Sequence, residues 1–119
     1  MKKTITLMVT LLMMSTIALA NEKLNGDQIK ELFTDKRFDG TNHNTGKDSS
    51  NQAKANGKMY ANVTMGPSWT IDWWVNESGQ HCLKHPKFGE SCGDIIDNGD
   101  GSYSRMVDGK KANTYKRFR

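Results

Sequence analysis

Hydrophobic side chains alternate with polar ones in the second half of the chain, and this alternation constrains the fold more than any other feature. Every second residue is apolar from Met59 to Met65, and the same period returns from Trp69 to Val75. A period of two is typical of a strand with one buried face. Gly66-Pro67-Ser68 lies between the two runs and has turn chemistry. The pattern predicts a β-hairpin.

Further strands are expected at short intervals after this hairpin. One strand should follow Gly79 and run into Cys82 and Leu83. Asn98-Gly99-Asp100-Gly101 is a strong hairpin signal, and a second Asp-Gly pair follows it. The last three strands are expected at Ser91–Asp97, Ser102–Val107 and Lys111–Phe118. Consecutive short strands joined by tight turns predict an antiparallel meander.

One short amphipathic helix is expected at Leu24–Phe33. Asn25 can cap its first turn, and Ile29, Leu32 and Phe33 lie on one face at helical spacing. A helix of this length is marginal in isolation. Its apolar face must therefore pack against the sheet.

The segment 39–58 is almost entirely polar, with Ala53 and Ala55 as its apolar residues. Two interpretations are open: a long loop, or a polar strand. Long loops are uncommon in compact domains. We therefore expect a weak strand near Ser49–Ala55.

The expected fold is mainly β with a minor helical part, in a single domain over 21–119. Its antiparallel meander forms a curved sheet or a small half-barrel, and the N-terminal helix closes one end. The core must be thin, because Leu, Ile, Val and Phe together number only 14 in this range. These features exclude a multidomain enzyme, a Rossmann-type nucleotide binder and a membrane channel.

Residues 1–20 have the three regions of a secretory signal peptide. Lys2 and Lys3 precede an apolar run over Ile5–Ile17, which ends in a small-x-small cleavage site. The run is too short for a membrane-spanning helix, which needs about 20 residues. We expect cleavage before Asn21, export to the periplasm or the medium, and no integral membrane segment afterwards.

Cys82 and Cys92 are the only cysteines of the chain. An oxidising compartment favours a disulfide between them. The bond would close a loop of nine intervening residues. In the chain-entropy model such a bond stabilises the fold by about 2–3 kcal/mol. A redox-active pair is disfavoured because the spacing is not Cys-x-x-Cys.

Positive charge is concentrated at the C-terminal end. Loss of Lys2 and Lys3 with the signal lowers the formal net charge from +4 to +2. A basic segment can bind nucleic acid, anionic lipid or glycan. On an edge strand, however, lysines more often prevent aggregation, which is the interpretation we prefer. The basic residues of this end are Lys110, Lys111, Lys116, Arg117 and Arg119.

Four motifs occur in order over residues 24–118. They are Leu24-Asn25-Gly26-Asp27-x-Ile29-x-x-Leu32-Phe33, Ser68-Trp69-x-Ile71, the pair Cys82 and Cys92, and Asp100-Gly101-x-Tyr103. Together they resemble a family of small secreted proteins from Gram-negative bacteria, of uncharacterised function, with a Gly-x-Trp strand, a cysteine staple and an Asp-Gly-x-Tyr hairpin. The resemblance implies a β-rich extracytoplasmic fold and no particular activity. The chain departs from the family at Ser68, where the family has Gly, and over 41–58, which lacks the family's aromatic residues.

The tryptophans divide between the two faces of the predicted hairpin. Trp69 and Trp73 have the parity of the apolar residues and are expected in the core. Trp74 has the opposite parity, beside Asp72 and near Tyr60 across the hairpin. An exposed aromatic pair next to a carboxylate can stack on a sugar or anchor a protein partner. The alternative is that the helix covers this face.

His81 and His85 are spaced four residues apart, which on a helix would direct two imidazoles at one metal ion. The proline that follows argues against a helix, and a third ligand would require His43 to fold back. The segment Asp97–Ser102 resembles a calcium loop with Asp108 at the twelfth position. Its glycines and flanking strands favour a plain hairpin. We expect no metal and no cofactor.

No catalytic motif is recognisable, because the chain has neither Gly-x-Ser-x-Gly nor His-Glu-x-x-His. We therefore expect no catalytic residues and no enzyme activity. A hydrolytic or metal-dependent enzyme is the least favoured hypothesis.

The preferred hypothesis is a small exported binding module of the periplasm. It would use the face of Trp74, Tyr60 and Asp72, or the cavity of the half-barrel. The alternative is an inhibitor or immunity-type protein that docks on an envelope or secreted enzyme through its disulfide loop. The docking residues would then be His85, Lys87 and Phe88. An envelope protein or a glycan is the expected partner class, and nucleic acid is not expected.

Overall fold

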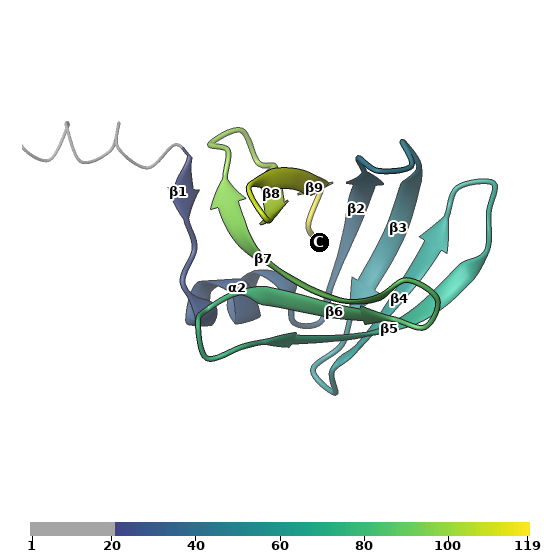
Figure 1. Ribbon diagram of the computed structural model, residues 1–119, viewed down its shortest axis with the longest axis horizontal. Helices are drawn as coiled ribbons and strands as arrows, with labels where there is room; N and C mark the ends of the chain where they lie inside the picture. Colours follow the sequence, from purple (N-terminus) through teal and green to yellow (C-terminus); the bar gives the residue numbers. More distant parts are fainter. Residues whose placement is uncertain (1–20) are drawn as a thin grey trace, which may run out of the picture.

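A computed structural model describes residues 21–119, and the export signal predicted for residues 1–20 lies outside this range. The described chain forms one short helix and nine strands (Figure 1). In chain order they are β1 (Glu22–Lys23), α2 (Gly26–Phe33), β2 (Lys36–Asn42), β3 (Asp48–Ala53), β4 (Lys58–Val63), β5 (Ser68–Val75), β6 (His81–His85), β7 (Gly89–Asp97), β8 (Tyr103–Val107) and β9 (Lys110–Lys116).

The strands from β2 to β9 form a closed, antiparallel, eight-stranded barrel. Each strand pairs with the next, and β9 returns to β2 with Asp39 opposite Lys116 and Asn42 opposite Asn113. The predicted mainly β meander with one helix is confirmed. The expected curved sheet or half-barrel is less closed than the observed barrel. Closure pairs the backbone groups that two free edge strands would otherwise expose.

The polar segment before Met59 contributes two strands to the barrel. The weak strand expected near Ser49–Ala55 is confirmed as β3. Strand β2 was not predicted from the sequence, because Phe38 is its only large apolar residue. Phe38 and Gly40 are buried, whereas the side chains of Arg37 and Asp39 alternate with them on the other face.

The basic C-terminal end seals the join between β2 and β9. Arg117 and Arg119 both pair with the carboxylate of Asp39, at 3.2 and 3.6 Å. The backbone of Arg119 also exchanges two hydrogen bonds of 2.9 Å with that of Arg37. Strand β9 lies between β2 and β8. The expectation that its lysines protect an edge strand is therefore wrong.

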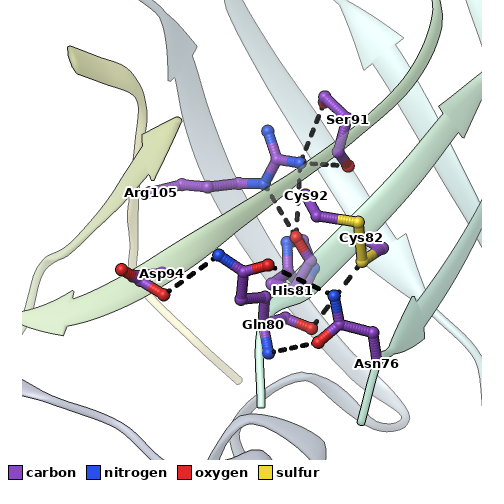
Figure 2. Close-up of a disulfide and its surroundings, with 8 residues drawn as sticks. All are labelled: Asn76, Gln80, His81, Cys82, Ser91, Cys92, Asp94 and Arg105. Atoms are coloured by element: carbon purple, nitrogen blue, oxygen red, sulfur yellow. Dashed lines mark hydrogen bonds between the residues drawn. A yellow bond between two sulfur atoms is a disulfide. The ribbon is translucent and has the colours of Figure 1, made fainter. Parts of the chain in front are cut away.

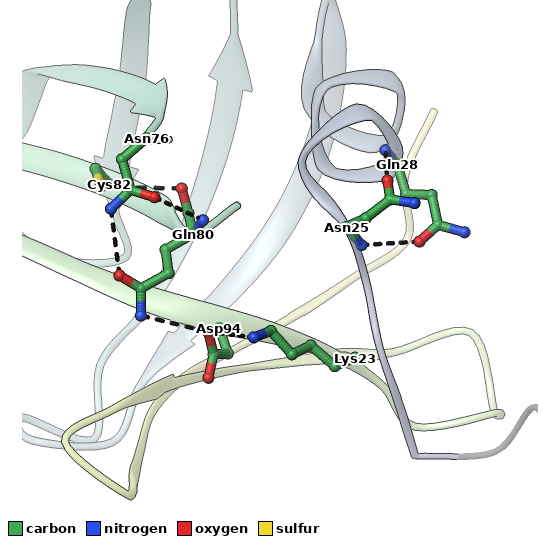
Figure 3. A network of polar contacts seen from close by, with 7 residues as sticks. All are labelled: Lys23, Asn25, Gln28, Asn76, Gln80, Cys82 and Asp94. Carbon is green, nitrogen blue, oxygen red and sulfur yellow. Dashed lines mark hydrogen bonds and ion pairs between the residues drawn. The ribbon is translucent and has the colours of Figure 1, made fainter. Parts of the chain in front are cut away.

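Helix α2 closes one end of the barrel, as predicted. Asn25 caps it, since its side chain accepts from the Gln28 N–H while its own N–H donates to the Gln28 side chain, both at 2.9 Å (Figure 3). In Figure 1 the helix lies at the left, and the β4–β5 and β6–β7 turns lie at the right. Ile29 and Phe33 have no exposed surface. The ring of Phe33 packs within 6.3 Å of the rings of Phe38, Trp73, His81, Tyr115 and Phe118.

Strand β1 pairs with the C-terminal part of β7, beyond the last residue that β7 pairs with β6. Lys23 of β1 forms an ion pair with Asp94 at 3.5 Å. Asp94 accepts a hydrogen bond from Gln80, which in turn bonds to Asn76 (Figure 3). This polar network ties the N-terminal strand to the β5–β6 turn.

The predicted disulfide between Cys82 and Cys92 is confirmed. The two cysteines lie directly opposite each other on β6 and β7 (Figure 2). A disulfide is consistent with an oxidising compartment. None of the helices within residues 21–119 is sufficiently long and apolar to cross a membrane.

Candidate functional site

A cavity of about 360 Å³ lies at the end of the barrel away from α2, beside the β2–β3, β4–β5 and β6–β7 turns. Cavities of this size accommodate small molecules. Most of its wall is apolar. The apolar and aromatic side chains of the wall include Met59, Ala61, Val63, Trp69, Ile71 and Leu83.

The cavity exists because inward-facing residues at this end are small. Gly40 and Ala61 line it, whereas large rings such as those of Phe33 and Trp73 fill the barrel near the helix. Eight strands enclose just enough space for side chains or for one small ligand. Small side chains on two of the strands therefore leave space for a ligand.

Three asparagines line the cavity: Asn42, whose Oδ1 accepts from the backbone N–H groups of Asn44 and Thr45 in the β2–β3 turn, and Asn51 and Asn113, which interrupt the apolar wall. Asn51 is only 6% exposed, and its Oδ1 accepts a hydrogen bond of 3.1 Å from Ser49 Oγ. The Oδ1 atom of Asn113 accepts from Arg105 Nη1 at 3.3 Å. Neither Nδ2 atom has a hydrogen-bond partner within residues 21–119. Each amide therefore presents N–H donors at the cavity wall.

Arg105 lies behind Asn113 and is only 2% exposed. Its Nε and Nη2 donate to the carbonyl oxygen of His81, and Nη2 also donates to the carbonyl and hydroxyl oxygens of Ser91, at 2.7 and 3.0 Å (Figure 2). Burial lowers the pKa of Arg105, yet a guanidinium stays charged in proteins. No carboxylate of the described chain pairs with it. A buried cation is thus held by neutral oxygens alone.

The predicted docking residues His85, Lys87 and Phe88 form one side of the cavity rim. The His85 ring lies 4.5 Å from the rings of both Trp69 and Phe88, and Lys87 Nζ lies 5.4 Å from the Phe88 ring. His85 Nδ1 accepts from the backbone N–H groups of Lys87 and Phe88. Partial burial and Lys87 lower the pKa of His85, so the neutral ring carries its proton on Nε2.

The predicted outer face is not continuous. Tyr60 is 41% exposed on β4, opposite Thr70. The next pair along the same face is Lys58 and Asp72, which form an ion pair. Its hydrogen bond lowers the pKa of Asp72. Trp74 lies beyond this pair and is half-buried opposite Cys82. The register therefore does not bring Trp74 and Tyr60 together.

The other two tryptophans lie inside the barrel, as their parity indicates. Trp73 is buried, and its indole N–H donates to the carbonyl oxygen of Lys54 at 2.9 Å. Trp69 is half-buried and contributes to the wall of the cavity. The parity of a strand thus separates core from surface here, but it does not distinguish a core residue from one that lines a cavity.

The three histidines lie apart. His81 is buried near the helix, His85 is at the rim, and His43 Nε2 bonds to Thr114 Oγ1 at 2.7 Å. Across residues 21–119, no three His, Cys, Asp or Glu side chains are close enough together to hold a metal ion.

The segment that resembles a calcium loop forms the β7–β8 turn. Asp97 and Asp100 each accept a hydrogen bond from a backbone N–H two residues further along, and Ser102 Oγ also donates to Asp100. The two hydrogen bonds from the hydroxyl and the backbone N–H of Ser102 lower the pKa of the Asp100 carboxyl. Asp108 lies at the other end of β8 and cannot complete a loop around one ion.

Sequence reasoning missed the polar residues of the cavity. Asn51 lies within the expected weak strand, and its parity with Ala53 was the available signal that it faces inward. Asn113 and Arg105 lie on predicted strands. Charged and amide side chains are normally assigned to the solvent face, so nothing in the pattern marked them.

The fold and the site define a closed eight-stranded barrel with a cavity of small-molecule size at one end. No family model, no curated protein and no solved structure matches the chain. The cavity must therefore be interpreted from its own chemistry.

Proposed function

We propose that this protein is a small, exported, non-enzymatic binding protein that takes a small molecule into its barrel. The cavity of about 360 Å³ carries the proposal. Ligand sites are typically concave and mostly apolar, with a few polar groups that fix orientation. The unpaired amides of Asn51 and Asn113 on an apolar wall fit this description.

The cavity is a better candidate than the outer face of Trp74, Tyr60 and Asp72. The outer aromatic residues are separated along the hairpin, and Asp72 is already paired with Lys58. A glycan would need a continuous aromatic platform with free polar groups. The inner surface offers convergent walls and unpaired donors together.

Filling the cavity tests the proposal. We expect neutral aromatic compounds of one or two rings, such as 2-naphthamide, to bind the wild-type protein in calorimetric titrations. Ala61→Phe places a ring in the cavity and should abolish this binding. Asn62→Phe, on the exposed outer face of the same strand, is the matched control and should bind normally. Absence of binding of both these compounds and their carboxylate analogues to the wild type, or equal binding by Ala61→Phe, contradicts the proposal.

Export is part of the proposal, and the disulfide supports it. The full chain should be found in the periplasm or the medium of a Gram-negative host, with Asn21 as the first residue by mass spectrometry. Intact protein of 119 residues in the cytoplasm, with free thiols, contradicts export.

One observation favours the alternative, an inhibitor or immunity-type protein. Phe88 is 70% exposed at the tip of the β6–β7 turn, with Lys87 beside it. Exposed aromatic residues often anchor a partner protein. If Phe88→Ala abolishes capture of an envelope enzyme while Ala61→Phe does not, the alternative replaces the cavity as the main function.

A further inference from the structure

We infer that the ligand of the cavity is a small organic anion, a monocarboxylate whose apolar body has one or two rings. Its carboxylate would lie against the amides of Asn51 and Asn113, in front of the Arg105 cation. This inference rests on the proposed function, because it names the chemistry of the molecule that the cavity takes.

The hydrogen-bond partners of the two amides determine which of their atoms is free. Arginine can only donate, so Asn113 must turn its Oδ1 to Arg105 and keep its Nδ2 for a ligand. In the structure the Ser49 hydroxyl donates to Oδ1 of Asn51 and leaves its Nδ2 free, although a hydroxyl, unlike arginine, can also accept. The free groups are donors, and a carboxylate is an acceptor-only group with two oxygens. Two amide donors therefore match one carboxylate.

Gly40 keeps one of these donors accessible. It lies on β2, between β3, which carries Asn51, and β9, which carries Asn113. A Cβ atom at Gly40 would stand 2.9 Å from Asn51 Nδ2 and 3.2 Å from the ring of Tyr115. Any larger residue would thus cover the amide and occupy the space in which a ligand's polar group would lie.

The charges around the cavity have an excess of positive sign. Arg105 is buried without a carboxylate partner in the described chain, and its field is strengthened by the low dielectric constant of the interior. Lys47 and Lys87 lie at the rim. Asp48 is the acidic residue among the cavity residues and accepts a hydrogen bond from Thr41. An anion would therefore be attracted, and a cation would be repelled.

The volume limits the size of the apolar body. An apolar cavity of about 150 Å³ binds benzene. The present cavity of about 360 Å³ is rather more than twice as large. It therefore fits about two rings with a carboxylate, and 2-naphthoate is a suitable probe.

Comparison of 2-naphthoate with 2-naphthamide tests the charge preference, because the two probes have nearly the same shape. We expect the wild-type protein to bind 2-naphthoate at least about tenfold more tightly at neutral pH, as charge-assisted hydrogen bonds are the stronger kind. Equal affinities, or tighter binding of the amide, would overturn the inference while leaving the proposed function intact. If the wild-type protein binds neither 2-naphthoate nor 2-naphthamide, nor any other compound of the neutral series, both the inference and the proposed function are overturned.

Isosteric variants test which residues cause the preference for 2-naphthoate over 2-naphthamide. Asn51→Asp replaces a donor with an anion and should weaken 2-naphthoate binding at least about tenfold, with 2-naphthamide affected little. Asn62→Asp makes the same change in net charge on the outer face of β4 and should leave both affinities unchanged. An equal loss in both variants would mean that net charge alone acts, which overturns the inference.

Asn113→Asp provides a second variant in case Asn51→Asp does not fold. Arg105 Nη1 lies 3.3 Å from the present amide oxygen of Asn113. The new carboxylate would therefore lie beside the guanidinium and neutralise its charge. The variant should remain folded and lose the preference for 2-naphthoate over 2-naphthamide. A preference that survives this neutralisation would show that Arg105 and Asn113 do not select the ligand.

Discussion

The imidazole ring of His81 is stacked on the ring of Phe33, with 4.4 Å between their centroids. Its two nitrogen atoms have no hydrogen-bond partner within the described chain, and the side chain has no exposed surface. Burial, reinforced by the Arg105 cation, holds the pKa of His81 well below its ordinary value of 6.5. His81 is therefore a neutral aromatic member of the core.

This environment predicts a loss of stability in mild acid. His81 is neutral in both states above about pH 6.5, where histidine titrates in an unfolded chain. Below that pH the unfolded chain binds a proton that the folded protein does not. The free energy of unfolding should then fall by up to about 1.4 kcal/mol per pH unit until the folded pKa is reached.

The His81→Phe variant isolates this contribution from that of the carboxyl groups. It keeps an aromatic ring against Phe33 and removes the titrating group, so its unfolding free energy should depend less on pH below about 6.5. His43→Gln removes an exposed histidine and serves as the control. Urea denaturation at a series of pH values measures the difference. Identical slopes for wild type and His81→Phe would refute the prediction.

Removal of the Phe33 ring of α2 should lower the free energy of unfolding more than any other single change considered. Phe33→Ala removes a fully buried ring that packs against five other rings, so we expect a loss of about 3–5 kcal/mol in unfolding free energy. Leu32→Ala, on the neighbouring half-buried position, should cost clearly less. Chemical denaturation compares the two. A similar cost for both would mean that α2 does not hold the core together.

The disulfide should stabilise the folded barrel by limiting the unfolded chain. Reduction of the bond between Cys82 and Cys92 should lower the free energy of unfolding by about 2–3 kcal/mol, as expected for a short closed loop. The double variant Cys82→Ala, Cys92→Ala should match the reduced protein. Thermal melts with and without reductant measure the effect, and an unchanged midpoint would contradict it.

Gly93 allows β7 and β8 to approach closely. A Cβ atom there would stand 2.6 Å from the carbonyl oxygen of Met106 and 3.1 Å from Cγ of Arg105. Gly93→Ala should therefore cost about 1–3 kcal/mol, the usual range for overpacking. Gly66 lies in the exposed β4–β5 turn, and a Cβ atom there would meet only Val63, the last residue of β4, so Gly66→Ala should cost less. Equal unfolding free energies for the two variants would show that β8 can shift freely.

The strands β4 to β9 and the helix could be predicted because their signals are local. Alternation over Trp69–Val75, the turn residues between strands, and the spacing of Ile29 and Phe33 each act within a few residues. Strand β2 has a single large apolar side chain, Phe38, and so its alternation is too weak to recognise. The outward position of Trp74 followed from parity, but its separation from Tyr60 depended on the register.

The amino-acid sequence by itself therefore determined the antiparallel meander, the capped helix and the pairing of Cys82 with Cys92. Only the tertiary structure decided that the sheet closes, because closure pairs residues as distant in the sequence as Asp39 and Lys116 through backbone hydrogen bonds that any side chain permits. It also decided where the cavity lies. A cavity is the space that side chains from many strands leave unfilled, and no local pattern of residues records that space.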